Sequence, residues 1–279
     1  SKYRKDIELY VGDVRDRESI VQSFAGIDTV FHLAALIAIP YSYSSPISYV
    51  RTNIEGSLNV FEASRNADIR MLVHTSSSEV YGTAKYVPID ETHSLQGQSP
   101  YAASKISADK LAEAYHLSFG LPVATIRPFN TYGPRQSSRA VIPTIISQAL
   151  NESNITLGNL TPTRDFNFVS DTVDAFIAVG SNSDAVGEVI NTGTGEEISI
   201  NDLVHVILGL VGKPNLDIQP DTNRMRPKMS EVDRLCADNG KAAELLDWRS
   251  QYTLKQGISE TIDWISNHPE YYRSEEYGV

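Results

Sequence analysis

The sequence has 279 residues, of which 41% are hydrophobic and 21% charged, as in ordinary globular proteins. Its net charge is −11 and it has no run of Lys and Arg, which excludes nucleic acid as a partner because phosphates need clustered positive charge. No apolar stretch approaches the roughly 20 residues of a membrane span, and no signal-peptide pattern opens the sequence. We therefore expect a cytoplasmic protein that does not contact a membrane.

Cysteine and histidine give no sign of a metal site. Cys236 is the single cysteine, so an internal disulfide and a cysteine-based metal site are both excluded. The six histidines are scattered without the spacing of metal ligands. We expect no bound metal.

The first half of the sequence alternates short apolar runs with longer amphipathic stretches. We predict strands at residues 7–11, 29–33, 71–75 and 123–126, with the second of them buried. We predict helices at residues 16–24, 53–66 and 101–119. Such alternation indicates a doubly wound parallel sheet of the Rossmann-like α/β class, covered by helices on both faces.

After Gly133 the pattern becomes irregular. Predicted helices at 141–151 and 201–209 are separated by loops rich in Gly, Pro, Asn and Asp. We expect a smaller α/β lobe over the carboxyl ends of the strands, where sheets of this class bind ligands. The predicted division assigns 1–139 and about 166–191 to the sheet domain, and about 140–165 and 192–279 to the smaller lobe.

A glycine-rich turn is missing before the first predicted strand. Dinucleotide-binding sheets open with a strand, such a turn and a helix whose N-terminus receives the pyrophosphate, and nothing like that turn precedes Ile7. We expect the sequence to begin near the third strand of such a sheet, truncated at its N-terminus, and to bind a dinucleotide weakly.

Tyr101 and Lys105 carry the strongest chemical signal. Their spacing of four places both side chains on one face of the helix predicted at 101–119. A Lys ammonium beside a phenol favours the phenolate and lowers a pKa that is about 10 in water, which makes Tyr a usable base. Taken alone, this short pattern fits an exposed Tyr and an unrelated Lys equally well.

Polar segments at two predicted strand ends strengthen the interpretation. Residues 75–82 (TSSSEVYG) follow one strand and residues 127–135 (RPFNTYGPR) follow the next. Their hydroxyls could simply cap turns, but both segments and the start of the 101–119 helix fall at the same edge of the sheet. We predict an active site at that edge.

These motifs, with 12–16 (GDVRD), 32–35 (HLAA), 52–56 (TNIEG) and 164–166 (RDF), resemble the extended short-chain dehydrogenases/reductases that act on nucleoside-diphosphate sugars. The resemblance covers essentially the whole sequence. It implies that the sheet domain binds NAD, that the smaller lobe binds a nucleotide sugar, and that the protein forms a homodimer through the helix carrying Tyr101 and a neighbouring helix.

The resemblance also implies residue roles toward NAD. Asp13 and Val14 would flank the adenine, and Leu33, Ala34 and Ala35 would line the phosphates and ribose. The remaining cofactor-binding residues would be Thr75, Tyr101, Lys105 and Pro128. NAD rather than NADP is expected from the resemblance alone.

For the substrate, the resemblance implies that Ser77 binds the 4-oxygen of the sugar. Asn130 and Arg164 would hold the diphosphate, since an Arg fork suits phosphate oxygens, and Arg226 and Arg234 the nucleotide end. The substrate-binding set also includes Arg139. For each arginine the alternative interpretation is an ion pair on the solvent-exposed surface of the protein.

Tyr101 would take the 4-hydroxyl proton while hydride leaves C4 for NAD. The resulting 4-ketone acidifies C5 and permits epimerisation, loss of water across C5 and C6, or decarboxylation of a uronic acid. Glu79 matches the Glu with which 4,6-dehydratases remove the C5 proton, and its alternative is a buried hydrogen-bonded carboxylate.

Ser78 stands where most 4,6-dehydratases carry an Asp acid, and serine is a poor general acid. Ser78-Glu79 also resembles UDP-glucuronate decarboxylases. The wider segments 32–43, 78–84 and 127–139 look most like the UDP-N-acetylglucosamine 4,6-dehydratases of the legionaminic-acid pathway, so we predict that type of lyase. A UDP-glucuronate decarboxylase, a 4-epimerase and a non-catalytic nucleotide-sugar binding protein remain the alternatives.

Overall fold

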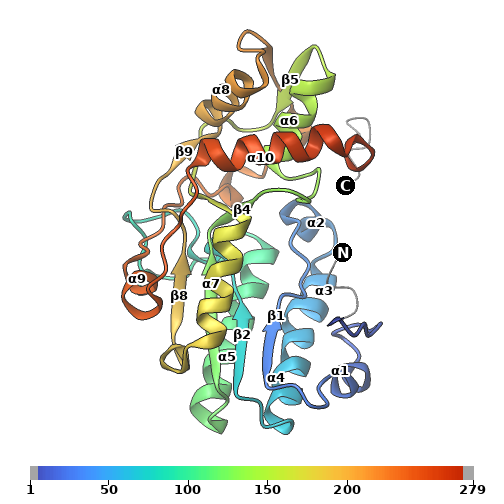
Figure 1. Ribbon diagram of the computed structural model, residues 1–279, viewed down its shortest axis with the longest axis vertical. Coiled ribbons are helices and arrows are strands. Elements are labelled where there is room, and N and C mark those ends of the chain that lie inside the picture. Colours follow the sequence, from blue (N-terminus) through green and yellow to red (C-terminus); the bar gives the residue numbers. More distant parts are fainter. Residues whose placement is uncertain (1–5, 273–279) are drawn as a thin grey trace.

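A four-stranded parallel sheet forms the centre of the computed structural model, which describes residues 6–272 (Figure 1). Its strands, in spatial order, are β1 (Thr29–His32), β2 (Met71–Thr75), β3 (Val123–Pro128) and β8 (Val189–Thr192). Their carboxyl ends point toward a second, mainly helical lobe. This arrangement confirms the predicted Rossmann-like α/β class.

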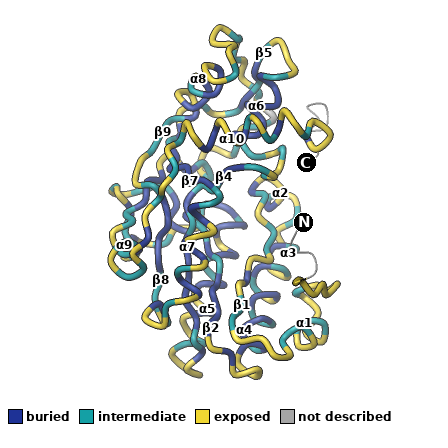
Figure 2. Tube along the Cα trace, viewed as in Figure 1, coloured by how far each residue is buried: buried dark blue, intermediate teal, exposed yellow. Residues whose placement is uncertain are grey.

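Helices cover both faces of the sheet. They are α4 (Gly56–Asn66) and α5 (Pro100–Phe119) on one face, and α7 (Val169–Ser181) and α9 (Gly240–Leu246) on the other. Leu72 packs with the α4 and α5 side, whereas its neighbours Met71 and Val73 pack with the α7 side. Because successive strand residues point to opposite faces, a continuous apolar run buries both, and β2, β3 and β8 are among the most buried segments (Figure 2).

Most predicted elements in this half are confirmed. Residues 71–75 are β2, the predicted helix at 101–119 is α5, and the strand predicted at 123–126 extends to Pro128. The helix predicted at 16–24 is α1 (Arg17–Ser23), which begins after an N-cap whose carboxylate accepts from two backbone N–H groups. The helix predicted at 53–66 is α4, preceded by a π-helical stretch at Val50–Glu55.

The strand predicted at residues 7–11 is wrong, because this segment is irregular and exposed. A β-strand is stabilised by pairing with a neighbour, and no described strand pairs with residues 7–11. The strand predicted at 29–33 is present as β1 but is not buried, since Phe31 is 42% and Leu33 60% exposed. In the described part of the chain β1 has β2 as its one neighbour and so forms the edge of the sheet.

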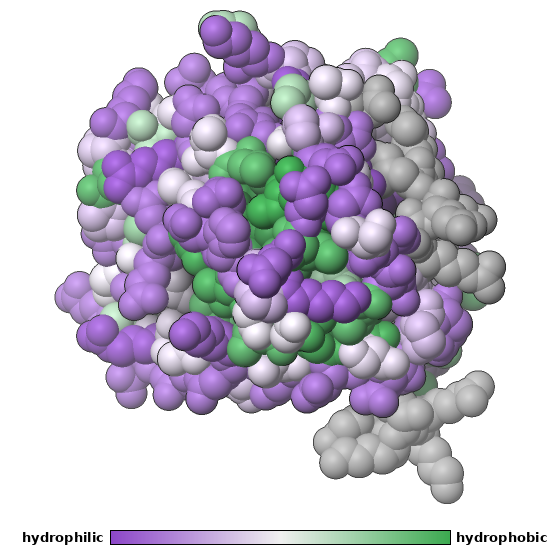
Figure 3. All heavy atoms as spheres, turned by 90° about the horizontal axis from the view of Figure 1, so that it is seen from above, coloured by the Kyte–Doolittle hydropathy of each residue, from purple (hydrophilic) through white to green (hydrophobic). Residues whose placement is uncertain are grey.

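The second lobe has its own hydrophobic core. It is built from α6 (Val141–Asn151), α8 (Ile200–Val211), α10 (Leu254–Asn267) and the paired strands β5 (Asn154–Leu157) and β10 (Asp217–Pro220). The helices predicted at 141–151 and 201–209 are α6 and α8. Seen from above, hydrophobic residues gather near the middle of the molecular surface and hydrophilic residues border them (Figure 3).

Short elements join the two lobes. They are α2 (Ile39–Ser44), α3 (Pro46–Tyr49), the strand pair β4 (Asn130–Tyr132) and β7 (Phe166–Phe168), and the strand pair β6 (Thr163–Arg164) and β9 (Ile198–Ser199). The exact sequence division between the lobes stays a prediction. No helix in the described residues is both long and apolar enough to cross a membrane.

Candidate active site

The carboxyl end of β2 places three polar residues in a fixed order. β2 ends at Thr75, and Ser77 caps a 3-10 turn at Ser78–Tyr81 by accepting a hydrogen bond of 3.2 Å from the Glu79 backbone N–H. Ser78 and Glu79 are both buried within this turn. The local cap therefore fixes the Ser77 oxygen and holds the Glu79 carboxylate in the protein interior.

Helix α5 brings Tyr101 and Lys105 to the same strand end. The helix starts at Pro100, after an N-cap at Ser99 that accepts from the Ala102 backbone N–H. Tyr101 lies in the first turn and packs edge-on against Tyr49, with ring centroids 6.3 Å apart. One turn later, Lys105 Nζ donates to the Thr75 carbonyl oxygen at 2.5 Å. The predicted meeting of these segments at one sheet edge is present.

The charge state of the Tyr101–Lys105 pair differs from the expectation of a lowered phenol pKa. Burial raises the pKa of Tyr101 to about 12, and the Glu79 charge adds to this effect, while a hydrogen bond from Ser77 opposes it. Burial also lowers the pKa of Lys105 to about 8, although the Asp109 charge partly compensates. Desolvation disfavours the charged form of each group, and the four-residue spacing alone does not reveal how completely α5 is covered.

Two arginines of the second lobe reach the Glu79 carboxylate region. Arg226 Nη1 lies 3.6 Å from Glu79 Oε1 and 3.7 Å from Glu231 Oε1. Arg164, on β6, lies with Nη2 3.8 Å from the same Glu231 oxygen and donates to the Thr163 carbonyl. Burial lowers the pKa of the Arg164 guanidinium. The structure thus brings Arg164 and Arg226 together with Glu79.

The other predicted substrate residues lie apart from this cluster or at its margin. Arg234 is about half exposed and pairs with Glu197, with Nε 2.8 Å from Oε1. Arg139 is exposed in the loop before α6. Asn130 begins β4 next to the end of β3, and its Oδ1 is buried with no hydrogen-bond partner among the described residues.

The predicted cofactor residues line the ends of β1 and β3 and the loop before α1. Leu33 and Ala34 are exposed directly after β1, Ala35 is half-buried, and Pro128 ends β3. Asp13 is exposed, and hydrogen bonds from Arg15 lower its pKa to about 2. Val14 packs against α4, where a Cβ on Gly56 would meet its side chain at 2.8 Å.

Asn53 positions the loop after β1, and our sequence reasoning gave it no role. Its side chain accepts from the Leu36 N–H at 2.8 Å and donates to the Leu36 carbonyl and to Ser104 Oγ, each at 2.9 Å. Asn53 therefore ties this loop to α5. Asn53 lies in the TNIEG motif, but no feature of the sequence indicates which residues it contacts.

Asp109 was also missed, although it follows Lys105 by one further turn of α5. Its Oδ2 accepts from Ser76 Oγ at 2.8 Å and from Arg127 Nε and Nη2 at 3.1 and 3.0 Å. Its Oδ1 lies 3.3 Å from His74 Nε2. Burial raises the pKa of Asp109, but its contacts with His74 and the charge of Arg127 outweigh burial, so the carboxylate stays ionised. The sequence feature that indicates Asp109 is its spacing of four residues from Lys105, which places both side chains on one face of the helix.

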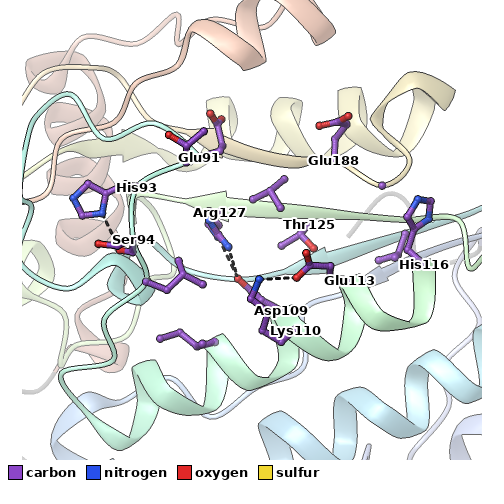
Figure 4. A pocket seen from close by; sticks show the side chains of 16 residues that line it. Glu91, His93, Ser94, Asp109, Lys110, Glu113, His116, Thr125, Arg127 and Glu188 are labelled. Atoms are coloured by element: carbon purple, nitrogen blue, oxygen red, sulfur yellow. Dashed lines mark hydrogen bonds and ion pairs between the residues drawn. The ribbon is translucent and has the colours of Figure 1, made fainter. Parts of the chain in front are cut away.

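A pocket of about 560 Å³ borders this network at Asp109 and Arg127 (Figure 4). It is lined by α5, by β3 and by loop residues including Glu91, His93 and Glu188. It shares Asp109 and Arg127 with the buried network but contains none of the predicted site residues, so we place the site at the strand ends instead. No group of His, Cys, Asp and Glu in the described residues could hold a metal ion.

Comparisons with known proteins agree with this geometry. Residues 1–261 match the family described as GDP-mannose 4,6 dehydratase. The UDP-glucose 4-epimerase of Mycolicibacterium smegmatis is 36% identical over 245 residues, covering 86% of this chain and 76% of the relative.

Two solved structures have the same fold. The dTDP-glucose 4,6-dehydratase DesIV from Streptomyces venezuelae, with NAD bound, has a TM-score of 0.88 at 27% identity, covering 94% of this chain and 80% of its own. The UDP-glucuronic acid 4-epimerase from Bacillus cereus, in complex with UDP-glucuronic acid and NAD, has a TM-score of 0.85 at 28% identity, with 92% and 80% covered. The chain belongs to the GDP-mannose 4,6 dehydratase family, among the extended short-chain dehydrogenases/reductases that include nucleotide-sugar dehydratases and epimerases.

Proposed function

We propose that this protein is an NAD-dependent nucleotide-sugar 4,6-dehydratase, a carbon–oxygen lyase, acting on UDP-N-acetylglucosamine. The observation that carries the proposal is the buried carboxylate of Glu79 beside the Ser77–Tyr101 pair. Oxidation at C4 needs a base for the hydroxyl, and elimination needs a second base for the C5 proton. A Tyr, a Ser and a Glu at one strand end supply both.

A buried hydroxyl at the end of β2 supports NAD as the cofactor. Thr75 Oγ1 is buried with no hydrogen-bond partner among the described residues, so it has capacity for a ligand. We assign Asp13, Val14, Leu33, Ala34, Ala35, Thr75, Pro128 and the Tyr101–Lys105 pair to the cofactor. When bound there, NAD supplies the hydride acceptor for C4.

Two side chains of the protein, Tyr101 and Glu79, then carry out the successive proton transfers. Tyr101 accepts the 4-hydroxyl proton, and because its pKa is raised to about 12, the Lys105 cation and the Ser77 hydroxyl are needed to stabilise the phenolate. Glu79 takes the proton from C5. The same carboxyl group can then deliver that proton to the departing 6-hydroxyl, which assigns the general-acid role left open by Ser78. Return of the hydride taken from C4 to C6, and of the proton held by Tyr101 to C5, would then leave the loss of one water as the net change.

Positive charge for the diphosphate comes from the second lobe. Arg164 and Arg226 are the two guanidinium groups at the Glu79 cluster, and Asn130, which begins β4 just after β3, has a side-chain Nδ2 that can donate to a phosphate oxygen. We place the diphosphate among these residues. The contact of Arg226 with Glu79 favours moving it from the nucleotide end, where the sequence resemblance placed it, to the diphosphate, and leaves Arg139 and Arg234 toward the nucleotide end.

One observation favours a second candidate, a UDP-glucuronate decarboxylase. Arg226 Nη1 is buried with no hydrogen-bond partner among the described residues and lies 3.6 Å from Glu79 Oε1. An arginine this close to the C5–C6 end of the sugar could bind a uronate carboxylate. A 4-epimerase would need no carboxylate at the position of Glu79.

The deciding experiment incubates the protein with NAD and either UDP-N-acetylglucosamine or UDP-glucuronate and follows the products by mass spectrometry. We expect loss of one water from UDP-N-acetylglucosamine. Loss of carbon dioxide from UDP-glucuronate, with UDP-N-acetylglucosamine unchanged in mass, would identify the decarboxylase instead. An isomer of unchanged mass would identify an epimerase.

A further inference from the structure

Residues 225–231 form a strap that runs from the second lobe to the proposed sugar site. Before the strap, β10 is paired in parallel with β5, and after it Thr163 and Arg234 form a β-bridge. The strap itself joins no described strand, and its Ser230 backbone N–H donates to the Pro227 carbonyl within the strap at 2.8 Å. Both ends are therefore fixed by strand pairing, whereas the middle depends on side-chain contacts.

The strap exposes one side to solvent and covers Glu79 with the other. Met225 is 49% and Met229 87% exposed, and Lys228 is exposed between them. No residue of the strap belongs to a described hydrophobic cluster. On the inner side, Arg226 Nη1 lies 3.6 Å from Glu79 Oε1, which is too long for a hydrogen bond. Because segments with few buried apolar contacts open at a small free-energy cost, the strap can leave Glu79 without disrupting either core.

A chain of two hydrogen bonds holds the strap to the sheet domain. The Tyr43 hydroxyl oxygen and Ser230 Oγ lie 2.6 Å apart, and the Ser230 hydroxyl donates to the Gln98 carbonyl. A serine hydroxyl has one hydrogen to donate, so Tyr43 is the donor to Ser230. The Gln98 side chain adds a bond from Nε2 to the Glu231 carbonyl at 2.9 Å. Three segments, α2, the strap and the residues before α5, thus meet at the Ser230 hydroxyl.

We propose that the strap is a lid over the sugar site and that the Tyr43–Ser230 hydrogen bond is the latch that holds it closed. This inference rests on the proposed function, because it takes the space beside Glu79 and Tyr101 as the place of the sugar ring. A sugar whose C5 proton goes to Glu79 must lie against that carboxylate, so the lid, with Arg226, has to move to admit it. When the lid closes again, it limits the access of water to the oxidised sugar.

Trypsin measures how often the lid opens, because Lys228–Met229 is the one bond in the strap that it can cut, Arg226 being followed by a proline. Cleavage follows the population of the open form when opening and closing are fast. Tyr43→Phe removes the latch and keeps the ring, whereas Ser230→Ala removes both bonds of the chain. Losing one hydrogen bond should raise the cleavage rate about fivefold, and Ser230→Ala should raise it at least as much. The double variant should match Ser230→Ala, since Tyr43 then has no partner to lose.

Two controls separate lid opening from a general loss of stability. Arg249 is an exposed tryptic site between α9 and α10, and Tyr115→Phe removes a hydrogen bond to Glu62 between α5 and α4. Cleavage at Arg249 should stay unchanged in the latch variants, and cleavage at Lys228 should stay unchanged in Tyr115→Phe. UDP-N-acetylglucosamine, added with NAD at about ten times the dissociation constant that calorimetry gives, should slow cleavage of the unchanged protein at Lys228 about tenfold.

Each result has a distinct meaning. Unchanged cleavage at Lys228 in Tyr43→Phe and Ser230→Ala would overturn the latch, and an equal rise at Arg249 would also overturn it, since the whole fold would then be weaker. A bound nucleotide sugar that leaves cleavage at Lys228 unchanged would overturn the lid, while the dehydratase proposal would stand. If the sugar slows cleavage but loses no water, the lid stands and the dehydratase assignment falls. If neither UDP-N-acetylglucosamine nor UDP-glucuronate binds, both proposals fail.

Discussion

Lys105 holds an ammonium group in the protein interior, 5% exposed, where it donates a hydrogen bond to the Thr75 carbonyl at the end of β2. Burying a cation costs free energy that a single carbonyl does not repay. Its pKa, lowered from 10.5 to about 8, expresses that cost. A residue that weakens the fold in this way is expected at a functional site rather than in a structural core.

Replacing Lys105 with Met should therefore stabilise the folded protein while it removes activity. At pH 7 we expect Lys105→Met to raise the free energy of unfolding by about 1–3 kcal/mol and to abolish turnover. Between pH 8 and 10.5 the folded protein loses the Lys105 proton before the unfolded chain does, so the unchanged protein gains stability and the difference shrinks. Urea unfolding across this range checks the trend, with Lys213→Met as the exposed control. A constant difference would contradict it.

Removing the Glu79 carboxylate should slow elimination while oxidation at C4 continues. Glu79→Gln keeps the shape of the side chain but cannot accept the C5 proton, so we expect elimination to slow by at least about a hundredfold. Oxidation at C4 uses Tyr101 and should continue, leaving reduced cofactor that absorbance detects. Tyr101→Phe should instead abolish both steps. Full water loss by Glu79→Gln would refute the assignment of both acid and base roles to this carboxylate.

At the scale of elements, Asp109 connects helix α5 to the two strands beneath the site. Through its carboxylate α5 contacts His74 on β2, Ser76 just after β2, and Arg127 on β3. Arg127 Nη1 extends the network by donating to the Tyr81 hydroxyl at 2.9 Å, within the 3-10 turn that carries Glu79. The site residues on α5 and on the β2 end are thus held in register by one buried carboxylate.

Asp109→Asn should destabilise the protein by about 3 kcal/mol, because it leaves the buried Arg127 guanidinium without its counter-charge. The double variant Asp109→Asn with Arg127→Met removes both charges and should cost less than the sum of the two single variants. Urea unfolding of all four proteins measures this coupling. Additive effects would show that the two side chains do not depend on each other.

The long helices and the apolar strands at the centre of the sheet could be predicted from the sequence, whereas very short strands and the pairing of strands could not. The helix at 141–151 was predicted to the residue because its apolar spacing and length are local properties. The strand at 7–11 has suitable residues but no described partner, and pairing is not visible in a single segment. For the same reason the two-residue strand β6, which carries Arg164, was not predicted.

Site residues, too, could be predicted only where they belong to a local motif. Ser77, Glu79, Tyr101 and Lys105 belong to compact motifs, and the structure brings them to one strand end. Glu231 stands within the segment from Arg226 to Arg234 but received no role, because its contacts join β6, a 3-10 turn and the β2 end. Contacts between distant segments depend on tertiary packing, which one sequence does not reveal.

At the scale of the whole molecule, the candidate site combines residues of the sheet domain with arginines from segments that lie outside the sheet. The sheet core supplies Tyr101, Lys105 and Glu79, while Arg164 and Arg226 come from segments that lie near the second lobe. Movement of one lobe against the other would therefore change the distance between the Glu79 carboxylate and the guanidinium groups of Arg164 and Arg226. Ion pairs across the site, such as that of Arg226 with Glu79, set the spacing in the structure described.

The exposed face of α5 carries the prediction of a homodimer. Ala103, Ser107, Lys110, Ala114 and Leu117 recur along it at helical spacing. Leu117 is 76% exposed, and Lys110 pairs with Glu113 at the surface of the helix. The small side chains on either side of Lys110 would allow a second copy of the helix to approach. We expect light scattering to give the mass of a dimer, and Ala114→Arg to give a folded monomer, because two guanidinium groups would meet at the interface. Leu210→Arg, on α8 of the other lobe, should remain dimeric. A monomeric mass for the unchanged protein at every concentration would contradict this prediction.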